Sequence, residues 1–177
     1  MPVVKVTEWH RALGRKHGLA SHFDVKNSGK ERNYGVDLSE EDWRRNAIMG
    51  STCQVVAADY LDLRNTGVDK RRADLADKIE VRGRFNVPGR DNLGIRPVDK
   101  FLHCPYLLVR IDEDMEHADV VGWLLGIEAK WRGEHGVNAV WGEHSKCWYV
   151  SEPYHSVESL LDWICCGMPR HTWRINP

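Results

Sequence analysis

The chain has 177 residues, of which 42% are hydrophobic and 29% charged, and its formal net charge at pH 7 is −1. These values are ordinary for a single globular domain that can bury a hydrophobic core. No run of 18 apolar residues occurs, which excludes a membrane-spanning helix, so we expect no membrane partner. The first residues lack the long apolar stretch of a secretory signal, so we expect a cytoplasmic protein.

The N-terminal part of the chain is interpreted as a basic extension of residues 1–35. Thr7 is a candidate cap for a short helix that ends near His17, and the segment from Gly18 to Gly35 is expected to form a loop. The segment 36–166 is predicted to be one domain, and residues 167–177 are predicted to form a C-terminal tail.

A long helix is predicted from Ser39 to Arg64. Ser39 is followed by an acidic first turn, which is typical of a capped helix start. An apolar stripe recurs at helical spacing along this segment and comprises Met49, Cys53, Val56, Tyr60 and Leu63. Small residues on a neighbouring stripe would let the helix pack closely on a sheet, with Gln54 directed toward that sheet.

The strands are predicted after the long helix. Residues 78–85 alternate between apolar and charged side chains, which predicts a strand with one charged face. The apolar runs 105–111 and 119–127 suit central strands that are buried on both faces. Residues 147–150 are expected to form a shorter strand, and 156–164 a closing helix. A helix followed by several strands and a final helix indicates an α/β or α+β fold.

The five cysteines are odd in number, and no two of them stand in a Cys-x-x-Cys spacing. We therefore expect reduced thiols rather than a disulfide framework. Two spacings, His144 with Cys147 and Cys166 with His171, leave a zinc site as an alternative, although structural zinc sites usually have tighter paired signatures.

Basic residues gather in two stretches of the chain. Residues 1–35 carry seven Lys or Arg against three acids, and residues 64–100 carry ten against six. The segment 36–63 between them holds six acids and two arginines. If folding joins the two basic stretches, the patch would suit phosphates, and DNA becomes an expected partner. A solvated surface of mixed charge is the alternative interpretation.

Carboxylates and a cation occur near residue 80 in a spacing that suits metal-dependent phosphodiester chemistry. Glu80 and Arg82 lie two residues apart, so both project from the same face of the predicted strand. An acid shortly upstream could reach the same place; Asp74 fits best, and Asp77 is an alternative. Mg²⁺ prefers carboxylate oxygens, and a nearby cation could neutralise the charge of a phosphate. The competing interpretation is a solvent-facing strand preceded by a turn.

Between residues 48 and 163, a helix, an acid, a Glu-x-Arg strand, two apolar strands, a short strand and a final helix follow one another. In this order they resemble the PD-(D/E)xK nuclease-like superfamily, and more narrowly a group of mostly uncharacterised phage and bacterial proteins. The segments that carry the resemblance are Gly50 to Leu61, Asp74, Glu80-Val-Arg82, Leu107-Leu-Val109, Val120-Val-Gly-Trp123 and Trp148-Tyr-Val150.

The resemblance implies an α/β fold with a restriction-endonuclease-like mixed central sheet of about four to five strands flanked by helices. It also implies a metal-dependent nuclease that hydrolyses phosphodiester bonds in DNA with Mg²⁺ or Mn²⁺. Asp74 and Glu80 would hold the metal, and Arg82 would orient the scissile phosphate. Gln54 would position water or a ligand.

Two residues depart from the pattern of active members. Gln54 stands where a helix acid is expected, and Arg82 replaces the usual lysine; arginine stays protonated and cannot serve as a neutral base. The alternative function is therefore a catalytically degenerate protein that binds nucleic acid or a protein partner, or that forms a homodimer. A third hypothesis is a structural or host-interaction protein whose exposed Trp and Cys side chains form an interface.

Overall fold

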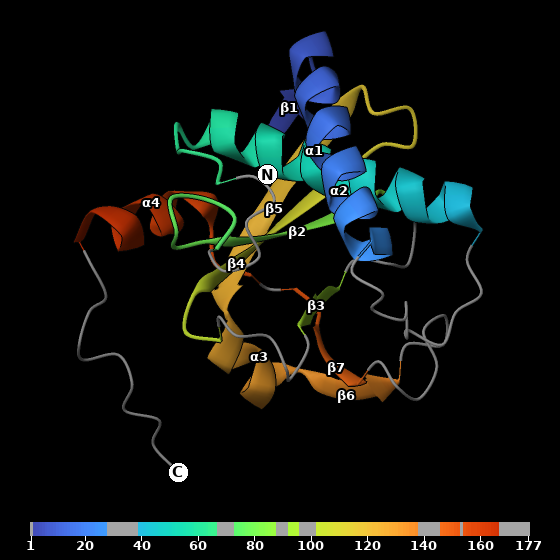
Figure 1. Ribbon diagram of the computed structural model, residues 1–177. Coiled ribbons are helices and arrows are strands. Elements are labelled where there is room, and N and C mark those ends of the chain that lie inside the picture. The colour runs from blue at the N-terminus through green and yellow to red at the C-terminus, as the bar shows by residue number, and fades with distance from the viewer. Residues whose placement is uncertain are drawn as a thin grey trace.

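The computed structural model describes residues 2–27, 39–66, 73–87, 92–95, 102–137, 146–152 and 154–166. This part of the chain contains four helices and seven strands (Figure 1). In chain order they are β1 (Val3–Lys5), α1 (Glu8–Asn27), α2 (Glu40–Tyr60), β2 (Glu80–Phe85), β3 (Leu93–Ile95), β4 (Pro105–Ile111), β5 (His117–Leu125), α3 (Gly126–Arg132), β6 (Glu134–Val137), β7 (Lys146–Val150) and α4 (Val157–Cys166).

Four strands form a mixed sheet in the order β1-β5-β4-β2. β2 runs parallel to β4, whereas the β4–β5 and β5–β1 pairs are antiparallel. All seven residues of β4 are buried, as expected of a central strand. β3, β7 and β6 form a second, antiparallel sheet of three strands that the sequence did not predict. The fold is therefore mixed α/β, in agreement with the predicted class.

The core consists of two apolar clusters on opposite faces of the mixed sheet. The first joins α2 and α4 to the sheet through residues such as Val56, Val109 and Leu160. The second fills the space between the mixed sheet and the three-stranded sheet, with Leu108 and Trp148 as members. In Figure 1, α1 lies over α2 on one side of the mixed sheet, and β3, β6 and β7 lie on the other.

The long helix predicted from Ser39 is confirmed as α2. The Ser39 hydroxyl oxygen accepts a hydrogen bond from the Asp42 backbone N–H at 3.1 Å and caps the first turn. The helix ends at Tyr60, four residues before the predicted end at Arg64. The helix packs directly on β2. The two elements are so close at Gly83 that a Cβ there would lie 2.9 Å from the Cys53 side chain.

α1 is longer than the short helix that the sequence predicted, and it continues to Asn27 where a loop was expected from Gly18. The reason is that Gly14 and Gly18 serve as contact residues rather than as helix ends. A Cβ at Gly18 would lie 2.5 Å from the Cα atom of Ile48, and one at Gly14 would overlap the Thr52 side chain. The missing side chains let α1 rest against the backbone of α2, and this packing compensates for the low helix propensity of glycine.

Two histidines join the ends of α1 to those of α2. His10 Nδ1 accepts a hydrogen bond from the Thr7 backbone N–H at 2.9 Å, which leaves Nε2 to donate to the Asp59 carboxylate at 3.1 Å. At the other end, His22 Nε2 lies 2.8 Å from Glu40 Oε1. Because residue 10 meets residue 59 and residue 22 meets residue 40, the two helices are antiparallel.

The strand predicted to run to Ile127 gives way to α3 at Gly126. The Glu128 side chain reaches back and accepts a hydrogen bond from the Leu125 backbone N–H at 2.8 Å, which stabilises the helix start. β6 follows α3 after one residue, Gly133. None of the described helices combines the length and the apolar character needed to cross a bilayer.

The contact between α1 and α2 leads to a testable prediction. We expect Gly18→Ala to lower the free energy of unfolding by about 1–3 kcal/mol, because the new methyl group must push two backbones apart. The matched control is Gly50→Ala in α2, where a Cβ would meet nothing within 4 Å. This variant should be unchanged or up to about 1 kcal/mol more stable, since alanine favours a helix over glycine. Urea unfolding of both variants measures these free energies. Equal changes in Gly18→Ala and Gly50→Ala would contradict the packing role of Gly18.

Candidate functional site

Asp74 lies in a tight turn that leads into β2. The Leu75 backbone N–H donates to the Ile79 carbonyl at 3.0 Å, which closes the turn and directs the chain into the strand. The Asp74 carbonyl accepts hydrogen bonds from both the backbone N–H and the hydroxyl of Thr66, at 2.9 and 2.8 Å. The backbone of Asp74 is thus fixed on both sides, and the position of its side chain follows from that of the turn.

The Asp74 carboxylate sits at the free edge of the mixed sheet. β2 is an edge strand, and the Val81 backbone N–H donates to Asp74 Oδ2 at 2.8 Å. Burial raises the pKa of the Asp74 carboxyl above its ordinary value of 3.8, while the Val81 N–H, the charge of Arg82 and a hydrogen bond from the Gln54 side chain oppose the rise. Burial thus disfavours the ionised carboxylate, while its neighbours Val81, Arg82 and Gln54 stabilise it.

Glu80 and Arg82 project from the face of β2 that points away from α2. Val81 and Gly83, which alternate with them, face the helix. The Glu80 side chain is only 10% exposed, and its Oε2 lies 3.5 Å from Nη1 of Arg82, whose side chain is 29% exposed. A buried carboxylate needs such a cation, because an isolated buried charge is very costly.

The four residues singled out from the sequence come from three separate parts of the chain. Gln54 comes from α2, Asp74 from the turn, and Glu80 and Arg82 from β2. The structure joins Gln54 to Asp74 by a hydrogen bond and Glu80 to Arg82 by an ion pair. Arg82 connects the two pairs, since its charge also acts on the Asp74 carboxylate. Arg82 thus forms an ion pair with Glu80, and its charge also favours the ionised form of Asp74.

The sequence left the choice between Asp74 and Asp77 open, and the two differ clearly in the structure. Asp77 is exposed in the turn and has a positive φ of 61°. Asp74 is partly buried and contacts Val81 and Gln54. Asp74 is therefore engaged with the other candidate residues, whereas Asp77 lies exposed in the turn.

Sequence reasoning missed two residues that border the site, Cys104 and Tyr106. Tyr106 is adjacent to Glu80 in the parallel β2–β4 register, and its ring lies under the Arg82 guanidinium, 5.0 Å from Cζ to the ring centroid. Burial raises the pKa of the Cys104 thiol, and the charge of Glu80 raises it further, so this thiol is not activated as a nucleophile. Neither residue could have been found without the register between two distant strands.

The donor set fits a divalent cation that prefers oxygen. Mg²⁺ usually takes one or two protein carboxylates and keeps several waters or substrate phosphates, so Asp74 and Glu80 would suffice. Among the residues that the structure describes, no three His, Cys, Asp or Glu side chains gather closely enough to hold a metal ion. A fully protein-coordinated site is thus not formed there. The histidines of the zinc alternative, His144 and His171, lie outside the described residues.

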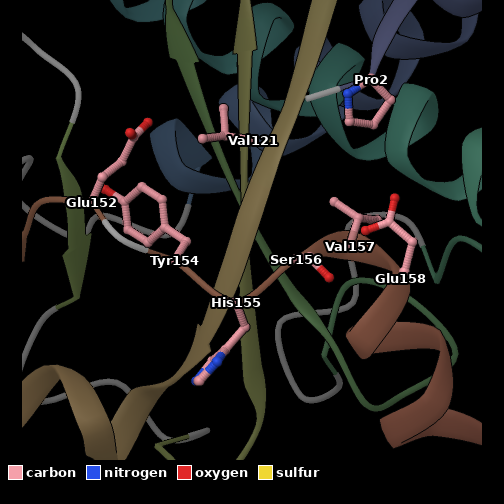
Figure 2. A pocket seen from close by; sticks show the side chains of 8 residues that line it. All are labelled: Pro2, Val121, Glu152, Tyr154, His155, Ser156, Val157 and Glu158. Atoms are coloured by element: carbon pink, nitrogen blue, oxygen red, sulfur yellow. The ribbon is translucent and has the colours of Figure 1, made fainter.

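A shallow pocket of about 310 Å³ lies elsewhere, beside β5. Figure 2 shows Glu152 and Tyr154 on one side of the strand and Val157 and Glu158 on the other, with His155 between them. The connecting segment can cross β5 so closely because residue 122 is glycine, where a Cβ would lie 2.7 Å from the His155 carbonyl oxygen. None of the four predicted site residues lines this pocket.

Comparisons with known proteins add no relative to this picture. No protein-family model matches the chain, and no match was found among curated proteins.

The buried Asp74 carboxyl predicts a specific pH dependence of stability. Asp74→Asn keeps the size of the side chain and an oxygen that can accept from the Val81 N–H. Because the folded-state pKa of Asp74 lies above its ordinary value of 3.8, the folded wild type binds this proton more tightly than the unfolded chain does. The wild type should therefore lose stability relative to the variant as the pH rises above 3.8, until Asp74 is ionised in the folded state.

Urea unfolding of the wild type and Asp74→Asn from about pH 3.5 to about pH 7.5 measures this difference. Asp77→Asn is the matched control, because it removes an exposed carboxyl from the same turn. A wild type that gains stability over Asp74→Asn with rising pH would contradict the raised pKa.

Proposed function

We propose that this chain is a PD-(D/E)xK-like, metal-dependent nuclease that hydrolyses phosphodiester bonds in DNA. The observation that supports it best is the convergence of two acids on one arginine. Glu80 pairs with Arg82 at 3.5 Å, and the same arginine acts on the partly buried Asp74. A carboxyl group with a perturbed pKa and a specific cationic partner, such as Asp74 with Arg82, is a candidate for a functional site.

The order of the elements also supports the proposal of a restriction-endonuclease-like fold. A helix, α2, packs on the sheet ahead of the acidic turn, and the Glu-x-Arg strand β2 is followed, after the short β3, by β4 and β5. This is the order in which the motifs of the superfamily occur in the sequence. The mixed four-stranded sheet with α2 on one face is compatible with that fold.

Each residue has a proposed part in the reaction. Asp74 and Glu80 would hold Mg²⁺ or Mn²⁺, which when bound supplies a Lewis acid for the phosphate and lowers the pKa of a water. Arg82 carries a permanent charge and a planar fork of donors, which suits it to bind and orient a phosphate. Gln54 fixes the Asp74 carboxylate through its hydrogen bond.

A cleavage assay with matched variants tests the proposal. With Mg²⁺ or Mn²⁺, the wild type should nick or linearise plasmid DNA, and Glu80→Gln and Asp74→Asn should each reduce the rate by about a hundredfold. Both variants keep the size and the hydrogen-bonding oxygen of the original side chain but lose its charge. Asp77→Asn, which changes the exposed acid three residues from Asp74, should cleave as the wild type does.

Two results would count against a nuclease. Wild-type protein that leaves DNA intact with both metals would reject it, provided that the sample unfolds cooperatively and is therefore folded. Cleavage that survives in Glu80→Gln and Asp74→Asn alike would show that the activity arises elsewhere or from a contaminant.

A second candidate function is binding of nucleic acid without catalysis, and one observation favours it. The Asp74 carboxylate already accepts hydrogen bonds from Val81 and Gln54, and Glu80 already pairs with Arg82. In such a degenerate site, Arg82 would contact the DNA backbone, and binding would weaken with rising salt without needing a metal.

The substitution Gln54→Glu separates the two candidates. It places a second carboxylate against Asp74, so the metal-free variant should unfold at a lower temperature than the wild type. If Asp74 belongs to a metal site, Mg²⁺ should raise the unfolding temperature of the variant more than that of the wild type, because a ligand stabilises the state that binds it. No Mg²⁺-dependent shift in either protein would favour the binding function, and thermal unfolding with and without Mg²⁺ measures it.

A further inference from the structure

Tyr106 lies on β4 beside the charged pair of Glu80 and Arg82 on β2. Its side chain is fully buried, and it is adjacent to Glu80 in the β2–β4 register, on the face of the sheet that also carries Arg82. The Arg82 guanidinium rests over the ring, 5.0 Å from Cζ to the centroid, at a separation typical of a cation–π contact.

The ring also packs closely against the start of α3. A Cβ built at Gly126 would lie 2.8 Å from Cε2 of Tyr106 and 2.7 Å from the Leu102 carbonyl oxygen. Only a residue without a side chain fits between the ring and the chain at Leu102. The ring under Arg82 is thus fixed by close packing at its Cε2 edge, unlike a flexible surface contact.

The contact between Arg82 and Glu80 is long for an ion pair. Charge-assisted hydrogen bonds from a guanidinium to a carboxylate usually measure about 2.7–2.9 Å, whereas the separation here is 3.5 Å. Since Tyr106 and Glu80 are neighbours on one sheet face, the ring and the carboxylate attract the same guanidinium from different positions. The guanidinium thus contacts the ring and the carboxylate at the same time.

We infer that Tyr106 is a positioning residue that keeps the Arg82 guanidinium from closing onto Glu80. The inference rests on the proposed function and deepens it. While Arg82 lies on the ring, its guanidinium and the Glu80 carboxylate stay 3.5 Å apart, and a tight pair between them does not form. Without the ring, Arg82 forms a tight bidentate pair with Glu80, and both groups are lost to the site.

The energetic coupling between Glu80 and Arg82 tests this without requiring activity. It is obtained from double-mutant cycles with Glu80→Gln and Arg82→Met, measured by urea unfolding in three backgrounds: wild type, Tyr106→Phe and Tyr106→Leu. The phenyl ring keeps the aromatic face, so Tyr106→Phe should leave the coupling unchanged. Tyr106→Leu removes that face and should raise the coupling about threefold or more, expressed as a ratio of unfolding constants.

Mg²⁺ titration of the same proteins links the inference to the site. Tyr106→Leu should bind Mg²⁺ more weakly than Tyr106→Phe, and Arg82→Met in the Tyr106→Leu background should restore the affinity. If the leucine variant does not fold, Tyr106→Met takes its place, because it fills more of the same space without an aromatic face. Equal Glu80–Arg82 coupling in the phenylalanine and leucine or methionine backgrounds would overturn the inference. Increased coupling in a protein that binds no Mg²⁺ would reject the proposed function and uphold the role of Tyr106.

Discussion

The close approach of α2 to β2 is the constraint on which the candidate site depends. Gly83 has no side chain, and a Cβ there would come within 2.9 Å of Cys53, so the helix and the strand touch directly. The next residue of the helix, Gln54, is thereby brought within hydrogen-bonding reach of Asp74 at the edge of the strand. A larger residue at position 83 would move the helix outward and separate the amide from the carboxylate.

The charges of the site are stabilised by their partners but remain costly to the fold. Burial opposes ionisation of Asp74, and the Glu80 side chain is 10% exposed. Only Arg82 supplies a positive charge to both acids in the contacts described for these residues. Apolar residues in the same places would cost less, because pairing rarely repays the full desolvation of buried charges. Such a local conflict with stability is expected where a protein binds a ligand or carries out chemistry.

The parts of the fold that could be predicted have local causes. Ser39 and the acidic turn after it specify the start of α2, and the continuous apolar run 105–111 specifies a buried strand. The remaining parts depend on contacts between distant segments. Gly18 was interpreted as the start of a loop because its role appears only when α1 lies on α2. Likewise, the proximity of Glu80 and Arg82 followed from their spacing on one strand, whereas Tyr106 lies beside them through a strand register that no local pattern encodes.

The most direct measurement is calorimetric titration of Mg²⁺ and Mn²⁺ into the wild type and Glu80→Gln, with Asp77→Asn as the matched control. We expect the wild type and the control to bind the metal with the same affinity, and Glu80→Gln to bind it about a hundredfold more weakly while unfolding as cooperatively as the wild type. Absence of metal binding in the folded wild type, or equal affinity in all three proteins, would contradict a metal site built from Asp74 and Glu80 around Arg82.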